Sequence, residues 1–288
     1  MTSFLEKIKD RRRRKALEKL KEKFAKSDQK LKQKNKLKIQ KNKTREPVPD
    51  KSAILLGLNY PGSHYTLKGC VNDVKNGAQY LEGLEYQVKT LFDQDISREY
   101  NLLEALEELR KSPSKNVFFH YSGHGTQVRD TDGDEEDGYD EVVYSKDGIQ
   151  ISDDQINKVI AKFSKDKSLV LVFDCCHSGS IADLPYIYTK NNGVKTEKVK
   201  KNVSSKVLCI SGCLDSQTAA DVTENRVAFG ALSSTLYSLL RKYKEEYKSL
   251  TWKQLYIDLI IEMEKKGYRQ YPMMSASDPT LFYEKISL

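Results

Sequence analysis

Two apolar segments that end in chemically reactive residues constrain the fold of this 288-residue chain more than any other feature. The first reads VFFHYSGHG over residues 117–125, and the second reads LVLVFDCCHSGS over residues 169–180. A buried parallel strand has a continuous apolar sequence, and open α/β sheets carry their ligand sites beyond the carboxyl ends of such strands. We therefore expect His124 and one of the adjacent cysteines, Cys175 or Cys176, to meet at one edge of a sheet.

Strand-like and helix-like patterns alternate through the rest of the chain. Strands are expected at 53–58, 86–92, 117–121, 169–173, 207–211 and 273–276. Helices are expected at 71–82, 97–110, 152–163, 229–243 and 251–265, with Ser97 and Ser152 as N-caps. This alternation predicts an α/β fold with a mostly parallel central β-sheet and helices on both faces. The acidic segment 127–148 and the Lys-rich segment 188–205 are expected to be loops, the second of them flexible.

The net charge of +8 is unevenly distributed. Residues 1–47 hold 19 Lys or Arg and 6 Asp or Glu, whereas the remainder holds 30 basic and 35 acidic side chains. The sequence therefore predicts a basic arm over 1–47, largely disordered or helical, followed by a mildly acidic domain over 48–288. A solvated tail is the simpler interpretation of the arm. Contact with nucleic acid or an anionic membrane is the alternative.

The five cysteines do not suggest a disulfide framework, because their number is odd and two are adjacent. The chain has no apolar run of membrane-spanning length, and its N-terminus lacks the apolar core of a secretory signal. We therefore expect an intracellular, reduced protein, in the cytoplasm or the nucleus.

A thiol beside an imidazole suits nucleophilic catalysis. A free thiol has a pKa of roughly 8.5, so a neighbouring histidine is needed to raise the reactive thiolate fraction and to protonate a leaving amine. The amides of Gly125 and Cys176 are candidates for an oxyanion hole. Strand alternation lets only one of Cys175 and Cys176 point at the sheet edge, and periodicity does not say which. The alternative is that both are ordinary buried thiols.

The motifs HYSGHG at 120–125 and DCCHSGS at 174–180 together resemble the motif pair of type I metacaspases, which are caspase-like cysteine peptidases. Supporting segments are GCVNDV at 69–74, YDE at 139–141, SDD at 152–154, ISGC at 210–213 and SAS at 275–277. The resemblance covers roughly residues 50–288. It implies a caspase-like three-layer sandwich, Cys176 as nucleophile, His124 as base, and a monomer. The arm is Lys-rich rather than Pro/Gln-rich, so adaptor recruitment does not carry over.

The resemblance also implies cleavage after Arg or Lys. Asp73, Ser122 and Asp174 would form the pocket for P1, the substrate residue that precedes the cleaved bond. Two carboxylates in a partly desolvated pocket favour a cationic side chain and repel an acidic one. The alternative for Asp73 is an ordinary acidic residue in the first turn of a helix.

The acidic segment has EF-hand-like spacing at Asp130, Asp132, Asp134 and Glu141, but Glu135 stands where an EF-hand requires glycine. The resemblance instead implies calcium ligands at Asp140, Asp153, Asp154 and Asp183. Ligands that are all oxygen suit Ca²⁺ better than a transition metal. The alternative is a solvated acidic loop with helix first-turn acids.

The sequence therefore predicts a calcium-dependent cysteine endopeptidase that cleaves after Arg or Lys. Calcium would order the loops beside the site, and self-cleavage of a zymogen would occur in the Lys-rich segments 1–47 and 188–205. Two alternatives remain. One is a catalytically weak caspase-like scaffold that binds through its basic arm, and the other is a caspase-fold peptidase with a different P1 preference.

Overall fold

The computed structural model describes residues 50–130, 138–176, 178–196, 203–212, 221–224, 227–246, 249–268 and 271–288. The predicted basic arm over 1–47 lies outside these residues, as do Asp132, Asp134 and Cys213. In the described part of the chain, no helix is long and apolar enough to cross a membrane.

An eight-stranded sheet forms the centre of the described structure, in the order β2-β1-β3-β7-β10-β13-β8-β9. The first five strands in this order run parallel, and the last three are antiparallel to their neighbours. Its strands are β1 (Lys51–Gly57), β2 (Gln87–Phe92), β3 (Asn116–Ser122), β7 (Ser168–Asp174), β8 (Tyr186–Thr189), β9 (Gly193–Thr196), β10 (Lys206–Ser211) and β13 (Met273–Ala276).

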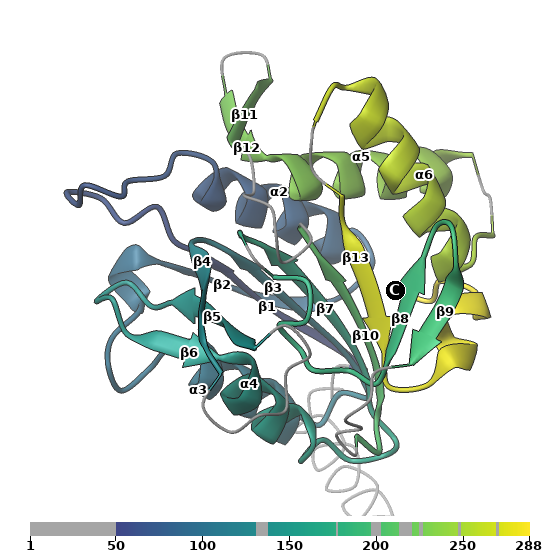
Figure 1. Ribbon diagram of the computed structural model, residues 1–288, viewed down its shortest axis with the longest axis horizontal. Helices are drawn as coiled ribbons and strands as arrows, with labels where there is room; N and C mark the ends of the chain where they lie inside the picture. Colours follow the sequence, from purple (N-terminus) through teal and green to yellow (C-terminus); the bar gives the residue numbers. More distant parts are fainter. Residues whose placement is uncertain are drawn as a thin grey trace, which may run out of the picture. The chain divides into compact units, whose positions relative to one another are not determined.

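Helices cover both faces of the sheet, which confirms the predicted three-layer α/β fold (Figure 1). One face carries α2 (Cys70–Glu82), α5 (Ala231–Glu245) and α6 (Trp252–Lys265), and the other carries α3 (Leu102–Lys111) and α4 (Asp153–Ile160). Short 3₁₀ helices are η1 (Asp93–Asp95) and η2 (Pro279–Tyr283).

Alternate residues of each central strand pack on opposite faces of the sheet. In β1, Ala53 and Leu55 belong to the apolar cluster with α2, α5 and α6, whereas Ile54 and Leu56 belong to the cluster with α3 and α4. In β7, Phe173 faces the α3 and α4 side. These continuous apolar runs are what a parallel strand buried on both faces requires.

One helix start differs from the prediction. Helix α3 begins at Leu102 and is capped by Asn101, not by Ser97. The Asn101 side chain accepts a bond from Leu103 N at 2.9 Å, and Glu104 bonds back to Asn101 N at 3.0 Å, which completes a capping box. Ser97 instead accepts from the amide of Tyr100 in the preceding turn. The Asn-x-x-Glu pattern was the signal that decides this boundary.

Both segments expected to be loops contain strands. The acidic segment forms most of a small antiparallel sheet of β4 (Gly125–Arg129), β5 (Tyr139–Tyr144) and β6 (Gln150–Ser152). The Lys-rich segment contributes to the β8–β9 hairpin, which pairs with β13 and extends the main sheet. A further hairpin joins β11 (Asp221–Glu224) and β12 (Val227–Gly230). The sequence pattern did not predict these short strands, because they are stabilised by pairing with other strands and not by their own residues.

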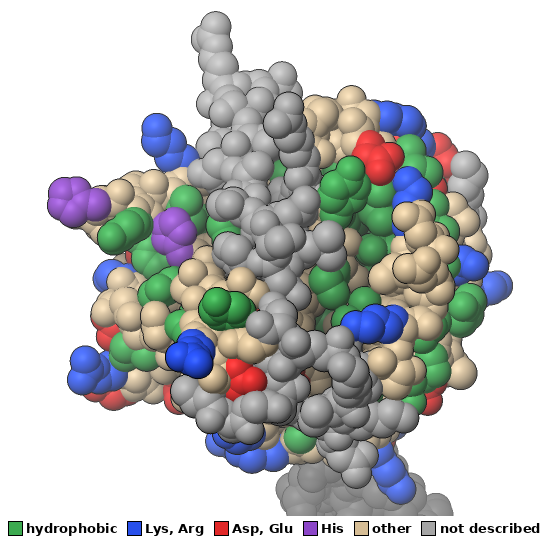
Figure 2. All heavy atoms as spheres, viewed as in Figure 1, with side chains coloured by type: hydrophobic (Ala, Val, Ile, Leu, Met, Phe, Trp, Pro, Cys, Tyr) green, Lys and Arg blue, Asp and Glu red, His purple; other side chains and the backbone are tan. Residues whose placement is uncertain are grey.

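The loop between β1 and α2, residues 58–69, projects from the body of the molecule (Figure 1). Histidine side chains are visible on the same side of the surface (Figure 2). This β1–α2 loop contributes directly to the site described below.

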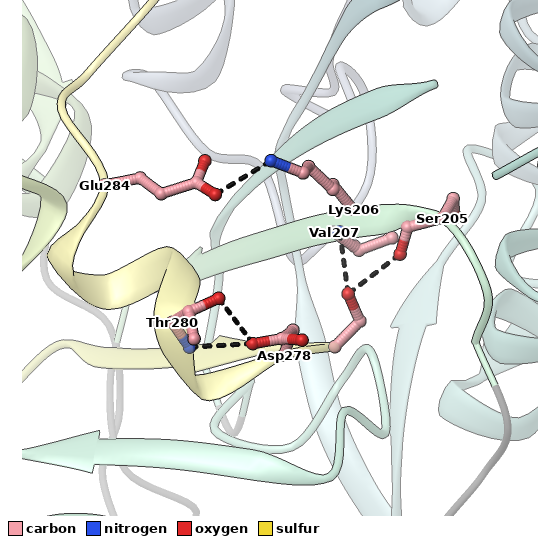
Figure 3. A network of polar contacts seen from close by, with 7 residues as sticks. Ser205, Lys206, Val207, Asp278, Thr280 and Glu284 are labelled. Atoms are coloured by element: carbon pink, nitrogen blue, oxygen red, sulfur yellow. Dashed lines mark hydrogen bonds and ion pairs between the residues drawn. The ribbon is translucent and has the colours of Figure 1, made fainter. Parts of the chain in front are cut away.

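Polar contacts fasten the C-terminal segment to β10 (Figure 3). Ser277 Oγ accepts from Val207 N at 2.9 Å and donates to the carbonyl of Ser205 at 2.8 Å. Lys206 forms an ion pair with Glu284 at 2.8 Å. The contacts hold β13 beside β10, where it separates the parallel strands from the β8–β9 hairpin.

Candidate active site

The two sequence motifs meet at one end of the sheet because β3 and β7 are adjacent parallel strands. Ser122 pairs with Asp174 in the strand register, and Gly123 N donates to the carbonyl of Asp174 at 3.3 Å. Beyond this point the segments remain in contact. A Cβ added to Gly125 would overlap the carbonyl oxygen of Cys176. The segments that contain His124 and Cys176 are therefore in close contact, and Gly125 has no room for a side chain at this contact.

The two adjacent cysteines have different environments. Cys175 is 1% exposed and belongs to the same apolar cluster as Phe173, on the α3 and α4 side. Cys176 is half-buried. A buried apolar setting makes a thiol inert, whereas nucleophilic thiols are partly accessible. The packing of Cys175 thus supplies a distinction that sequence periodicity could not make.

The β1–α2 loop holds the imidazole of His124. Nε2 lies 2.6 Å from the carbonyl oxygen of Tyr65, and the Tyr60 ring lies 4.8 Å from the imidazole between centroids. A carbonyl oxygen can only accept a hydrogen bond, so we assign the proton to Nε2. In the neutral imidazole this assignment leaves Nδ1 free of a proton and able to receive one.

The three residues predicted for the P1 pocket come together where Ser122 and Asp174 pair at the ends of β3 and β7. Asp73 is 0% exposed, Ser122 1% and Asp174 5%. Ser122 Oγ donates to Asp73 Oδ2 at 2.8 Å. These positions lie on α2, β3 and β7, three elements that are separated in sequence and converge on one side of the sheet.

The N-terminus of α5 binds both carboxylates. Gly230 N donates to the two carboxylate oxygens of Asp73 at 2.9 and 3.0 Å, and Ser233 N donates to Asp174 Oδ2 at 2.8 Å. The exposed amides and the macrodipole at a helix N-terminus favour anions there. A Cβ on Gly230 would overlap Asp174 Oδ2 and lie 2.9 Å from Asp73 Oδ2, so the two carboxylates converge on this glycine.

A second group of carboxylates lies beside the site. Asp153, 1% exposed, accepts from Glu141 N and from Asp154 N, each at 2.7 Å. Burial and, after it, the nearby charge of Asp183 together raise the pKa of Asp153 to about 9. Ser180 donates to the carboxylate of Glu141, which links this group to the segment after Cys176.

The four predicted calcium ligands do not form a preassembled ion site. Among the described residues, no group of three or more His, Cys, Asp or Glu side chains is arranged to hold a metal ion. Asp153 and Asp183 interact electrostatically, and Asp183 has a left-handed backbone with φ of 47°. The donor atoms are all oxygen, as Ca²⁺ prefers, but the carboxylates would have to move together to bind it.

Comparison with known proteins decides the family. The family model for the caspase domain matches residues 50–283. Metacaspase-1 of Mycosarcoma maydis is 32% identical in a match that covers 80% of this chain and 71% of that protein. The chain belongs to the metacaspases.

Other relatives agree with this assignment. Metacaspase-1 of Cryptococcus neoformans is 33% identical, with 80% of this chain and 63% of that protein covered, and metacaspase-1B of Neurospora crassa is 32% identical, with 79% and 66% covered. This metacaspase thus spans about two thirds of the length of these relatives. It is also similar to the crystal structure of protein GSU0716 from Geobacter sulfurreducens, with a TM-score of 0.59, 26% identity, and 81% and 96% of the two chains covered. The metacaspase is therefore a caspase-family cysteine peptidase.

Sequence reasoning missed a buried network behind the two carboxylates. His120 is 0% exposed, with Nε2 3.0 Å from Ser233 Oγ and Nδ1 3.1 Å from Tyr237 Oη. Its contact with Ser233 supports the residue whose amide binds Asp174. Burial lowers the pKa of His120 to about 3, so the imidazole is neutral at ordinary pH. The only sequence signal was a histidine inside an otherwise apolar strand.

Proposed function

We propose that this metacaspase is a calcium-dependent endopeptidase that cleaves after Arg or Lys, with Cys176 as nucleophile and His124 as general base and acid. The observation that carries the proposal is the convergence of two buried carboxylates, Asp73 and Asp174, beside the Ser122–Asp174 pair after which the two reactive segments leave the sheet. The dyad supplies peptide-bond chemistry, and the carboxylates supply a preference for a cation.

The reaction follows from the two side chains. Nδ1 of His124 takes the thiol proton, and the Cys176 thiolate attacks the carbonyl carbon of the scissile bond. The oxyanion of the tetrahedral intermediate is stabilised by the amides of Gly125 and Cys176. The imidazolium then protonates the leaving amine, which leaves an acyl-enzyme. Water, deprotonated by His124, hydrolyses the thioester and restores the thiol.

The P1 preference has an electrostatic basis. Asp73, Ser122 and Asp174 line the proposed pocket, and two carboxylates held with little solvent attract a guanidinium or ammonium group more strongly than exposed ones. An acidic P1 side chain is repelled by the same pair. Because Asp73 is 0% exposed, a P1 side chain enters only after the pocket opens.

We propose calcium as the ion that would order the loops beside the site. Burial and the charge of Asp183 disfavour an ionised Asp153, and a divalent cation would offset both effects. Asp140, Asp153, Asp154 and Asp183 are the proposed ligands. Asn157 holds the Asp183 loop by donating to the carbonyls of Ala182 at 2.9 Å and Asp183 at 3.1 Å, so ion binding would act on a loop that follows Cys176. Bound by these residues, the ion would supply positive charge that holds the loops in one arrangement, and it would not act on the scissile bond.

We also propose self-cleavage and a monomeric active form. Self-cleavage would occur in the Lys-rich segments 1–47 and 188–205 and would release the domain from its basic arm. The active form would be a monomer in the cytoplasm or the nucleus, and its partners would be protein substrates with Arg or Lys at P1. Contact with nucleic acid or an anionic membrane would be confined to the arm.

A P1 panel tests the function. Fluorogenic peptides that differ only in P1, with Arg, Lys, Asn or Asp, are incubated with the protein in calcium or in chelator. We expect hydrolysis of the Arg and Lys peptides in calcium alone, and none by Cys176→Ala. Hydrolysis that persists both in chelator and in Cys176→Ala would exclude the proposal. A biological effect retained by Cys176→Ala would favour the scaffold alternative.

A further inference from the structure

Two buried tyrosine hydroxyls hold the backbone of His124. The amide of His124 donates to Tyr60 Oη at 3.1 Å, and Tyr121 Oη donates to the carbonyl of His124 at 2.9 Å. The two hydroxyl oxygens lie 2.9 Å apart. The contacts therefore close a ring that engages both polar groups of the His124 backbone, and either hydroxyl can donate to the other. We call this ring the tyrosine clasp.

The clasp is anchored on β5. The carbonyl oxygen of Tyr144 lies 2.9 Å from each of the two hydroxyls, and Tyr144 N donates to the His124 carbonyl at 3.1 Å. Each hydroxyl has one proton and more than one acceptor within reach. A hydroxyl that rotates away from one acceptor can therefore donate to another. Tyr60 is 7% exposed and Tyr121 1%, so water does not compete for these bonds.

Tyr60 reaches the clasp in a strained conformation. Its φ of 51° is in the left-handed region, which is costly for a bulky side chain. The buried carboxylate of Asp93 holds this conformation, because Oδ1 accepts from Tyr60 N at 2.8 Å and Oδ2 accepts from Asn59 N at 3.1 Å. Such strain persists only where the surroundings fix it, and here it directs an aromatic ring and a hydroxyl at one histidine.

The motif glycine before His124 provides the space for the clasp. A Cβ added to Gly123 would collide with Tyr121 Oη and lie 2.9 Å from Tyr60 Oη. Burial raises the pKa of Tyr60 and the pKa of Tyr121 well above the ordinary value for tyrosine. The hydroxyls therefore stay protonated and neutral at ordinary pH.

We propose that Tyr60 and Tyr121 are positioning residues that fix the backbone of His124 and thereby set the imidazole against Cys176. This inference rests on the proposed function, in which His124 is the base. The Tyr65 carbonyl fixes one nitrogen of the ring, and the clasp fixes the peptide from which the ring extends. Because a displacement of about 1 Å can reduce catalysis about 100-fold, such support affects turnover directly.

Tyr60→Phe and Tyr121→Phe each remove one hydroxyl and keep the ring. We expect each variant to lower kcat about 10- to 100-fold on the Arg peptide, with KM within about twofold of wild type, because neither hydroxyl contacts the P1 carboxylates. The double variant should lose less than the product of the single losses, since both hydroxyls act on one peptide. Tyr256→Phe is the matched control, because its buried hydroxyl donates to the carbonyl of Pro272 at 3.0 Å in the other layer.

The possible results separate the clasp from the proposed function. If His124→Ala is inactive while both Tyr→Phe variants keep kcat within about twofold of wild type, the clasp is refuted and the dyad stands. A rise in KM with unchanged kcat would also refute it. If His124→Ala retains full activity, the proposed function and the clasp both fail. If Tyr121→Phe does not fold, as judged by its melting temperature, the kcat of Tyr60→Phe decides.

Discussion

The buried imidazole of His120 makes the folded state of this metacaspase less stable as the pH falls. The pKa of His120 is lowered by burial from an unfolded value of 6.5 to about 3. Between these values the unfolded chain binds a proton that the folded chain does not bind, so protons favour unfolding. The stability is fully present above pH 6.5 and is lost as the pH falls toward 3.

The size of this effect follows from linkage. Each unit of pKa shift corresponds to about 1.4 kcal/mol, so lowering the pH from 7.5 to 5.0 removes about 2 kcal/mol of unfolding free energy through His120 alone. That amount is a large part of the stability of an ordinary domain. The contacts of both ring nitrogens with Ser233 and Tyr237 hydroxyls leave the charged form without an anionic partner.

Urea unfolding at the two pH values measures the effect, in a Cys176→Ala background that prevents self-cleavage. His120→Gln cannot take up the proton, so its stability should fall about 2 kcal/mol less than that of the parent over this range. Carboxylates contribute equally to both proteins and cancel in the difference. His64→Gln, at an exposed position, is the matched control for loss of an imidazole. Equal pH slopes for the parent and His120→Gln would refute the reasoning.

Three further substitutions test the site. Gly230→Ala should lower kcat/KM for Arg peptides at least about tenfold, because its Cβ overlaps the Asp174 carboxylate. An unchanged kcat/KM for these peptides would contradict the proposed role of Asp174 in the P1 pocket. Gly125→Ala should reduce kcat about 100-fold or more, because its Cβ overlaps the Cys176 carbonyl, and normal turnover would show that this contact is not needed. Asp153→Asn should raise the calcium concentration for half-maximal activity at least about tenfold, and calcium titrations that superimpose on wild type would remove Asp153 from the proposed ligands.

The fold was predictable where the pattern is local. Apolar runs located β1, β3 and β7, and the predicted N-cap at Ser152 correctly placed the start of α4. Local pattern was ambiguous at α3, where Ser97 and Asn101 are both good caps and only the Asn101–Glu104 pair closes a box. Hairpins such as β8–β9 escaped prediction because their stability comes from pairing with β13, whose residues lie 86 to 90 positions further along the chain.

The residue types of the candidate site were predictable from the sequence. The contacts that hold those residues in place were not. Motif spacing predicted that His124 and one cysteine follow adjacent strands, and the resemblance pointed to Cys176, whereas the burial of Cys175 beside Phe173 is visible only in the fold. The pairing of Asp73 with α5 joins residues 157 positions apart, which no local pattern reveals. Tyr60 is likewise invisible as a partner of His124, because its role depends on a left-handed backbone that only the folded loop displays.

Covalent labelling tests the central claim most directly. A peptide chloromethyl ketone with Arg at P1 is incubated with the calcium-loaded protein, and the alkylated residue is identified by peptide mass mapping. The account predicts one adduct, on Cys176, which forms far faster than with the matched Asp reagent and is lost in His124→Ala. An adduct on Cys175, or equal labelling by the Arg and Asp reagents, would contradict it.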